Sequence, residues 1–338
     1  MEHILSYYFE RPEDVLVQPI TVGLINDTFQ VSLGINRFIL QKINTSIFKS
    51  PEVIISNTLA IGQHLKNNNY SKEVVEIIPN RNGNFITFSN GEIWRMTKYI
   101  PNSVCINKVQ SKEQAFEAAK CISEFHRLLN DFSTDRIQSS IPGFLDYRKR
   151  VEDFKLALKN ANEERQHIAR AEIDYINAHL SLIDEYLQIE FPTRVVHADA
   201  KIGNFLFDAN DSMKPIALID WDTILPGNVL CDFGDMIRTY SNLKVEDDPE
   251  GKNNFSLTYY QSVKDGFLYH LSDVLTEKEI EATDLTAFVV ILIQAIRFLT
   301  DYLNGDIYYH TTRENQNLDR TINQINLLKA IEEELCIH

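Results

Sequence analysis

Two short apolar runs, residues 205–207 and 216–219, restrict the fold of this chain more than any other feature. The segment between them is polar, rich in turn-forming residues and ends in proline, so the two runs are predicted to be the strands of a β-hairpin. A hairpin returns the chain to its starting point. Asn204 before the first strand and Asp220 after the second are therefore expected to lie side by side, with Asp199 on the loop that leads in.

Three oxygen-bearing side chains brought together in this way suit phosphoryl transfer. Two oxygen ligands fit a hard cation such as Mg²⁺ that carries a nucleotide, and a further carboxylate can orient an attacking hydroxyl. The alternative is a polar loop that leads into an ordinary hairpin, in which Asp220 only caps the end of a strand. The spacing His-x-Asp-x-x-x-x-Asn before the hairpin and Ile-Asp-Trp-Asp after it favours the catalytic interpretation.

The same spacing resembles the catalytic and metal-binding loops of the protein-kinase-like phosphotransferases, and more narrowly those of the aminoglycoside phosphotransferase family. The resemblance implies an α+β, protein-kinase-like two-lobed fold with a small antiparallel-sheet N-lobe and a larger, mostly helical C-lobe. It also implies ATP and Mg²⁺ as cofactors. Asp199 would accept the proton of the substrate hydroxyl, and Asn204 and Asp220 would hold Mg²⁺ on the phosphates.

The composition argues against several classes of partner. The chain carries 33 Lys and Arg against 48 Asp and Glu, and the net charge of 33 − 48 = −15 repels nucleic acids and anionic membranes. The longest apolar run, 287–293, is far shorter than the roughly 20 residues of a membrane helix. The four cysteines are widely spaced, which indicates reduced thiols in a cytoplasmic protein. We expect a monomer.

The pattern of the chain changes at about residue 100. Runs typical of strands fill residues 15–99 around one helical stretch at 51–66, and helical patterns dominate after residue 111. We therefore expect residues 1–100 to form a nucleotide-binding N-terminal lobe and residues 101–338 to form a lobe for catalysis and acceptor binding. The long helices expected in the second lobe are 111–131, 144–161, 164–188, 228–242, 250–271, 276–303 and 313–335.

The resemblance also implies where the nucleotide binds. In that family, backbone atoms of the linker between the lobes hold the adenine, and a turn between the first two strands covers the phosphates. The matching linker is 97–101 and the matching turn is 23–28, for which a plain hairpin turn is the alternative because it contains one glycine. The residues of these segments that are expected to contact the nucleotide are Gly23, Asn26, Thr28, Lys98, Tyr99 and Ile100.

One position of the family pattern is ambiguous in this chain. Such kinases usually pair a lysine on the third strand with a helix glutamate, but here that strand ends in Gln41 and Lys42. Side chains alternate along a strand, so only one of the two faces the cleft. Either Lys42 faces inward without its partner, or Gln41 forms a neutral pair with Asn57 on the following helix. We favour the neutral pair.

Several residues around the loop are predicted to support it. His197 is expected to hold the loop by hydrogen bonds, and Asp222 is expected either to reach a second metal position or to act behind the metal ligands. Asp232 matches a helix aspartate that braces the loop in the resembled family. The Asp-Phe-Gly sequence that it begins comes too late in the chain to supply the metal ligand. Lys201 either meets the transferred phosphate or is a solvated surface lysine.

Motifs spread over most of the chain resemble the N-acetylhexosamine 1-kinase branch of the family. They include Ile-Asn-Asp-Thr-Phe, Leu-Gln-Lys-Ile-Asn and Arg-Phe-Leu-Thr-Asp-Tyr-Leu-Asn-Gly-Asp. The resemblance implies a small-molecule sugar substrate, N-acetylglucosamine or N-acetylgalactosamine, phosphorylated by ATP on its anomeric hydroxyl. A neutral sugar needs polar side chains and an aromatic face around it. The candidates for binding it are Arg238, Arg297, Asp301 and Tyr308.

Other interpretations stay open at this point. Arg297 and Asp301 are four residues apart on one helix face, so they can equally form a surface ion pair. The acceptor can instead be choline, homoserine, an aminoglycoside or another sugar. A pseudokinase that binds a nucleotide without transferring phosphate is a further alternative, suggested by the weakened third-strand pair. The presence of Asp199, Asn204 and Asp220 argues against it.

Overall fold

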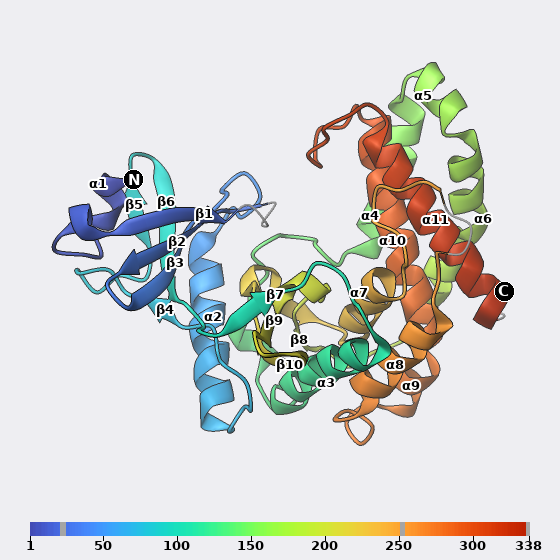
Figure 1. Cartoon of the computed structure of the whole chain (residues 1–338). Coiled ribbons are helices and arrows are strands. Elements are labelled where there is room, and N and C mark those ends of the chain that lie inside the picture. Colours follow the sequence, from blue (N-terminus) through green and yellow to red (C-terminus); the bar gives the residue numbers. More distant parts are fainter. Residues whose placement is uncertain (21–24, 251–253, 336–338) are drawn as a thin grey trace.

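The computed structural model describes residues 1–20, 25–250 and 254–335 of the chain. A small antiparallel sheet lies on one side of the molecule and a larger group of helices on the other, with helix α2 (Pro51–Asn67) next to the sheet (Figure 1). The predicted fold class, α+β with a sheet-based N-lobe and a mostly helical C-lobe, is therefore confirmed.

The N-lobe sheet has six strands in the order β1-β2-β3-β6-β4, and β5 also pairs with β6. The strands are β1 (Leu16–Ile20), β2 (Asp27–Leu33), β3 (Asn36–Lys42), β4 (Ile77–Ile78), β5 (Thr87–Ser89) and β6 (Glu92–Lys98). Apolar residues on one face of β2, β3 and β6 pack with the short helix α1 (Glu2–Leu5). The buried residues of this cluster are Ile4, Leu5, Val31, Leu40, Trp94 and Met96.

The register between β3 and β6 determines which polar side chains face the C-lobe. Gln41 pairs with Arg95, and Lys42 pairs with Trp94. Directly opposed residues of an antiparallel pair project to the same face, whereas successive residues project to opposite faces. Gln41 and Arg95 therefore share one face of the sheet, and Lys42 projects from the other.

Helix α2 belongs to the core of the C-lobe as much as to the sheet. Ile61 and Leu65, near its C-terminal end, are fully buried in the large hydrophobic cluster of the helical lobe. Glu73, just after the helix, forms an isolated β-bridge with Ala217 of the C-lobe hairpin. These contacts fix the sheet against the helical lobe, on which the position of the candidate site depends.

Nine helices make up most of the described C-lobe: α3 (Lys112–Leu128), α4 (Tyr147–Asn160), α5 (Glu163–Ile168), α6 (Arg170–Tyr186), α7 (Leu230–Tyr240), α8 (Leu257–Leu268), α9 (Glu277–Glu281), α10 (Thr283–Leu303) and α11 (Gln316–Leu335). The expected helix 164–188 is wrong as a single element. The backbone of Ala169 (φ −90°, ψ 18°) leaves the helical region and separates α5 from α6. Ala282 likewise divides the expected helix 276–303, although alanine favours helix and gives no signal of a break.

The predicted hairpin is confirmed. Strand β9 (Phe205–Asp208) pairs antiparallel with β10 (Asp211–Leu218). A third strand, β7 (Ser103–Cys105), pairs with β9 and was not predicted, because three residues are too few for a periodic pattern. A separate two-stranded ribbon joins β8 (Arg194–Val196) to β11 (Leu225–Gly227). The loop between β8 and β9 carries Asp199.

Helix α10 is the one described helix that is long and apolar enough to cross a membrane, and 67% of its most apolar window is buried within the fold. It packs against α4, α7 and α11, so its apolar surface serves the core of the C-lobe. The three described cysteines, Cys105, Cys121 and Cys231, are free thiols, in agreement with their wide spacing in the sequence.

Candidate active site

The hairpin brings its two ends together at the start of β9. The backbone N–H of Ile219 donates to the carbonyl of Asn204 at 2.8 Å. The Nε2 atom of His197 lies 2.9 Å from the carbonyl oxygen of Ile219. Asn204 and Asp220 are thus held next to each other through Ile219, as expected from the two apolar runs, and His197 ties the loop to the same point.

Asp199 sits within a small polar cluster on that loop. Its Oδ2 atom accepts hydrogen bonds from Lys201 Nζ at 2.7 Å and from Asn204 Nδ2 at 2.8 Å. Burial alone would raise the pKa of Asp199, but the charge of Lys201 and these hydrogen bonds outweigh it and lower the pKa below its ordinary value. The carboxylate is therefore ionised near neutral pH. Lys201 pairs with Asp199, and 45% of its side chain stays exposed.

Asp220 has the opposite electrostatic environment. Burial raises its pKa to about 6, with further contributions from the negative charges of Asp222 and Asp199. Its backbone also adopts the left-handed conformation (φ 63°, ψ 55°), which turns the chain sharply at the end of β10. A buried carboxylate that is crowded by other acids favours a bound cation, because a cation offsets both the burial and the repulsion.

The donor set fits Mg²⁺ on a nucleotide. Asn204 uses its Nδ2 group for Asp199, which leaves its Oδ1 atom as the oxygen available to a metal. Within the described ranges, no group of three or more His, Cys, Asp and Glu side chains is placed to hold a metal ion by itself. Mg²⁺ bound with a nucleotide needs only one or two protein carboxylates, since phosphates and water complete its shell. Asp220 and Asn204 are the residues that would hold it.

Asp232 at the start of α7 is buried directly beneath the loop. Its carboxylate accepts hydrogen bonds from the backbone N–H groups of His197 at 2.8 Å and Ala198 at 2.6 Å. His126 Nε2 lies 3.0 Å from the same carboxylate. A carboxylate that satisfies two successive backbone donors fixes the path of the chain there. This is the geometry that a bracing role for Asp232 requires.

The backbone of Ala198 on this loop is strained, because its φ of 64° lies in the left-handed region, which is unfavourable for residues other than glycine. We expect the Ala198→Gly variant to be more stable than the wild type by about 0.5 to 1 kcal/mol, since glycine adopts this region without a steric penalty. Chemical denaturation measures the difference. Ala200→Gly, at a buried neighbouring residue without positive φ, is the matched control and should lower stability. Equal effects of the two substitutions would contradict the strain at Ala198.

Arg95 on β6 is the main site residue that the sequence interpretation missed. Its Nη1 atom lies 2.6 Å from Asp222 Oδ1, and its Nη2 donates to Asp222 Oδ2 at 2.9 Å. Its Nε donates to Gln41 Oε1 at 2.9 Å. The sequence contained one indication of this role: Arg95 stands between Trp94 and Met96 on a predicted strand, and these two neighbours are buried. Because side chains alternate along a strand, the charge of Arg95 is on the face opposite the apolar core.

These contacts show that Gln41, and not Lys42, is on the face of the third strand that meets the C-lobe. Gln41 also donates from Nε2 to Thr28 at 3.2 Å, whereas Asn57 donates to the carbonyls of Gln138 and Ile224. The predicted neutral pair between Gln41 and Asn57 is therefore wrong, because each side chain has other partners. Lys42 pairs with Asp27 at 2.7 Å and with Glu92 at 3.4 Å, on the other face of the sheet.

The predicted phosphate turn is only partly described. Gly23 lies outside the described residues. Asn26 donates from Nδ2 to Asp222 Oδ2 at 2.8 Å, and its Oδ1 accepts from the backbone of Asn44. The hydroxyl of Thr28 donates to the carbonyl of Asn26 at 3.3 Å. The side chains of Asn26 and Thr28 are thus engaged with protein groups, and Asn26 attaches the turn to the C-lobe.

In the linker, the backbone groups of three residues are already in use. Lys98 N–H donates to Glu76, Tyr99 N–H donates to Arg37, and the Ile100 carbonyl accepts from Ser103. The contact of Lys98, Tyr99 and Ile100 with adenine stays a prediction, and it has to use their other backbone atoms.

The acceptor candidates fall into different roles. Asp301 accepts hydrogen bonds from the backbone N–H groups of residues 307–309 and from Asn317 Nδ2, so both of its oxygens are occupied. Its prediction as a sugar ligand is wrong for that reason, and so is the alternative of an ion pair with Arg297. Arg297 instead donates to Gln294 at 2.9 Å. Tyr308 lies in the loop that donates to Asp301 and is 55% exposed.

Arg297 lies against two aromatic rings, and Arg238 lies between two acidic side chains. The guanidinium carbon of Arg297 is 5.4 Å from the ring centre of Phe144 and 5.7 Å from that of Tyr309. Arg238 pairs with Asp235, three residues earlier on α7, at 2.9 Å and with Glu246 at 2.7 Å. The charge of Asp199 contributes to raising the pKa of Asp235, after burial, which relates this pair to the loop.

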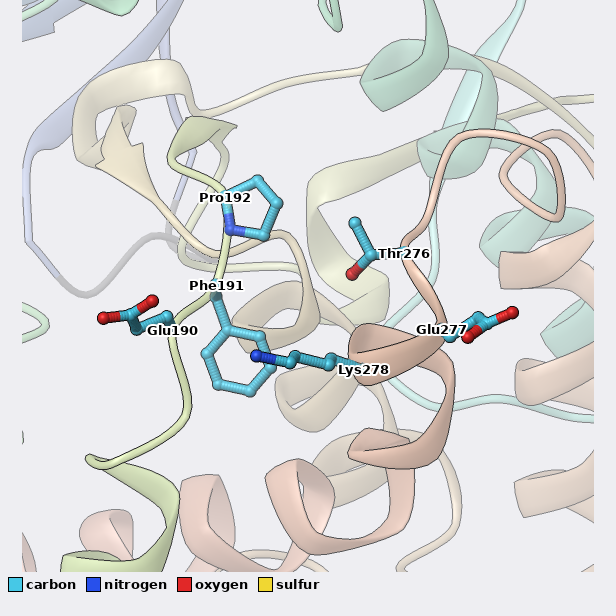
Figure 2. A pocket seen from close by; sticks show the side chains of 6 residues that line it. All are labelled: Glu190, Phe191, Pro192, Thr276, Glu277 and Lys278. Carbon is cyan, nitrogen blue, oxygen red and sulfur yellow. The ribbon is translucent and has the colours of Figure 1, made fainter.

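Two hollows in the surface lie away from Asp199, Asn204 and Asp220. One of about 490 Å³ is lined by residues 190–192 and by 276–278 at the start of α9 (Figure 2). Residues 190–192 precede β8, whereas Asp199 follows it, so this hollow is at the opposite end of that strand. Another, of about 310 Å³, adjoins Lys42 and Glu92. Neither contains Asp199, Asn204 or Asp220.

Comparison with known proteins agrees with this geometry. The model of the phosphotransferase enzyme family matches residues 16–262, which include both strands of the hairpin and all three converging side chains. The match covers most of the chain and continues from the N-lobe sheet into α8.

Solved structures with the same fold cover nearly the whole chain. A microcompartment-associated aminopropanol kinase has a TM-score of 0.66 at 13% identity, with 99% of this chain and 96% of that chain covered. Choline kinase LicA from Streptococcus pneumoniae has a TM-score of 0.60 at 13% identity, covering 98% and 99%. A spectinomycin phosphotransferase in complex with ADP and spectinomycin has a TM-score of 0.60 at 11% identity, covering 95% and 92%. At these identities the likeness shows the fold.

Proposed function

Because this chain belongs to the phosphotransferase enzyme family, we propose that it is a small-molecule kinase that transfers the γ-phosphate of ATP to the anomeric hydroxyl of an N-acetylhexosamine. The observation that carries the proposal is that one hairpin brings Asn204 and Asp220 together, with Asp199 of the preceding loop hydrogen-bonded to Asn204. In this proposal residues 1–100 bind the nucleotide, residues 101–338 carry catalysis and the acceptor, and the protein works as a cytoplasmic monomer.

Asp199 orients the acceptor hydroxyl and takes up its proton. Its lowered pKa keeps it ionised, and Lys201 and Asn204 hold its Oδ2 atom in one position. The transition state of phosphoryl transfer is loose, so orientation matters more than early proton removal. A hemiacetal hydroxyl is more acidic than an ordinary alcohol, and a carboxylate of low pKa is a sufficient base for it.

Asn204 and Asp220 hold the metal in this proposal. Mg²⁺, when bound, neutralises the developing charge on the phosphates and keeps them in line with the acceptor. Asp220 supplies a carboxylate whose charge Lys201 and Arg95 offset only in part, and Asn204 supplies its amide oxygen. Asp222 acts behind them by holding Arg95 and Asn26. His197 and Asp232 keep the loop in place.

The acceptor is proposed to lie between α7 and α10. Arg297, with Phe144 and Tyr309 beside it, offers a polar group next to aromatic faces, which is what a sugar ring requires. Arg238 pairs with Asp235 through Nε and with Glu246 through Nη1, and its Nη2 group is proposed to bind the acceptor. Tyr308, which is half-exposed, is also proposed to contact the acceptor.

A panel of acceptors tests the proposal. With ATP and Mg²⁺, we expect ADP release with N-acetylglucosamine or N-acetylgalactosamine, and a phosphorus NMR signal coupled to the anomeric proton. Turnover of only choline, an aminopropanol, homoserine or an aminoglycoside would overturn the sugar assignment and keep the kinase. Intact ATP binding without turnover of any acceptor would favour a pseudokinase.

A substitution at Arg297 tests the acceptor side separately. We expect Arg297→Ala to raise the KM for the acceptor by about tenfold or more, since a lost hydrogen bond to a charged donor is worth about 1.5 to 3 kcal/mol. The KM for ATP should stay unchanged. Arg313→Ala is the matched control, because Arg313 is an exposed arginine paired with Asp319. An unchanged acceptor KM in Arg297→Ala would remove that residue from the site.

A further inference from the structure

The nucleotide site needs positive charge that its expected residue does not supply. The chain is strongly acidic, and Asp199, Asp220 and Asp222 are gathered near one point. Lys42 projects from the other face of the sheet, where Asp27 and Glu92 hold it. A triphosphate approaching three carboxylates is repelled unless cations stand between them. Lys201 pairs with Asp199 on the C-lobe side, and a cation on the inner face of the sheet can take this part on the N-lobe side.

Arg95 is that group. Among the described residues it is the one lysine or arginine that is buried, at 5% exposure. It lies opposite Gln41 in the β3–β6 register, so it projects from the face that a third-strand lysine would otherwise use. Its partner is Asp222, two residues after the proposed metal ligand Asp220.

The hydrogen bonds of Arg95 orient it without exhausting it. A guanidinium carries five N–H groups. Nε donates one hydrogen bond to Gln41 and Nη2 donates one to Asp222 Oδ2, while Nη1 lies 2.6 Å from Asp222 Oδ1 as an ion-pair contact. The fork geometry of arginine lets one edge hold a carboxylate while the remaining N–H groups bind phosphate oxygens.

The burial of this ion pair is also better explained by binding than by stability. Taking both charges out of water costs about as much as their attraction returns, so a buried pair adds little to the folding free energy. In this position it has a second effect: the guanidinium masks the Asp222 carboxylate, which would repel a phosphate. Asn26 donates to the same carboxylate and so connects the predicted phosphate turn to the pair.

We propose that Arg95, oriented by Asp222 and Gln41, binds the nucleotide phosphates in place of a lysine on β3. The proposal rests on the ATP site of the proposed function and deepens it. It makes Gln41 and Asp222 positioning residues for the guanidinium. Because Asp222 belongs to the C-lobe and Arg95 to the N-lobe sheet, the same contacts join the two lobes around the phosphates.

Binding of ATP and of adenosine to the full-length protein, both with Mg²⁺ and followed by calorimetry or competition, separates a phosphate contact from a structural role. We expect Arg95→Met to weaken ATP binding by about tenfold or more and to leave adenosine binding within about twofold. Arg95→Lys should recover part of the loss. Lys42→Met, on the adjacent strand and turned away from Asp222, should keep the affinity for ATP.

The double variant Arg95→Met with Asp222→Asn guards against a folding failure, because it leaves no unpaired charge in the core. Compared with Asp222→Asn alone, the double variant should lose preference for ATP over adenosine by the same factor as Arg95→Met does compared with the wild type. A preserved preference in both Arg95→Met and the double variant, or equal losses for ATP and adenosine, would overturn the role of Arg95 while leaving the kinase proposal intact. A wild-type protein that binds no ATP would overturn both.

Discussion

We expect the Asp199→Asn variant to lose at least about 10²-fold in kcat, within the range of about 10² to 10⁴ that a general base contributes. Asparagine keeps the size of the side chain but cannot take up the proton of the acceptor. It also cannot pair with Lys201, which lies 2.7 Å from the carboxylate in the wild type. The KM values for ATP and for the acceptor should change little, since the substitution affects the transition state more than the bound ground state.

Steady-state kinetics with both substrates varied measures this effect. A thermal unfolding curve close to that of the wild type shows that the loss is chemical. The control is Asp208→Asn, at the far end of β9, where the carboxylate lies 3.8 Å from Lys214 and has no part in the proposed site. A kcat for Asp199→Asn near the wild-type value would exclude Asp199 as the base.

The Asp220→Asn variant should show two effects of opposite sign. It should lose activity by a factor comparable to that of Asp199→Asn, because a proposed metal ligand loses its charge. In EDTA it should also melt higher than the wild type, by roughly 2 to 5 °C for a domain of this size. Burial and the neighbouring acids raise the pKa of Asp220 to about 6 in the folded protein, so its ionised form destabilises the metal-free fold.

The pH dependence follows from the same shift. A carboxyl group whose pKa is raised on folding adds stability below its unfolded pKa, and this contribution is lost as the pH rises through the folded value. The stability advantage of Asp220→Asn should therefore be absent near pH 4 and should grow until the pH exceeds about 6. Melting temperatures of both proteins in EDTA across this range measure the difference. A constant difference at all pH values would contradict the uncompensated charge at Asp220.

The part of the site that depends on local sequence pattern could be predicted from the sequence alone. Two apolar runs around a polar turn predicted the hairpin, and the hairpin alone implied that Asn204 and Asp220 would be neighbours. The change from strand-like to helical pattern predicted a sheet-rich first part and a helical second part, since periodicity reflects which face of each element is buried, and the family resemblance implied the fold class. These inferences required no knowledge of how distant segments pack.

The rest of the site depends on contacts between distant segments. Arg95 and Asp222 are far apart in the sequence and meet only because the sheet packs against the helical lobe. Asp301 resembled a sugar ligand on its helix face, yet the loop that follows folds back and uses both of its oxygens. The neutral pair of Gln41 with Asn57 failed similarly, because backbone carbonyls of the C-lobe, unidentifiable from sequence, bind the Asn57 amide.

We propose that Asp220 and Asn204 hold a divalent ion on the nucleotide beside Asp199. Calorimetric titration of ATP into the wild type and into Asp220→Asn, each with Mg²⁺ and with EDTA, tests it most directly. We predict that Mg²⁺ strengthens ATP binding to the wild type by about tenfold or more and has a much smaller effect on the variant. An equal effect of Mg²⁺ on both proteins would contradict the claim.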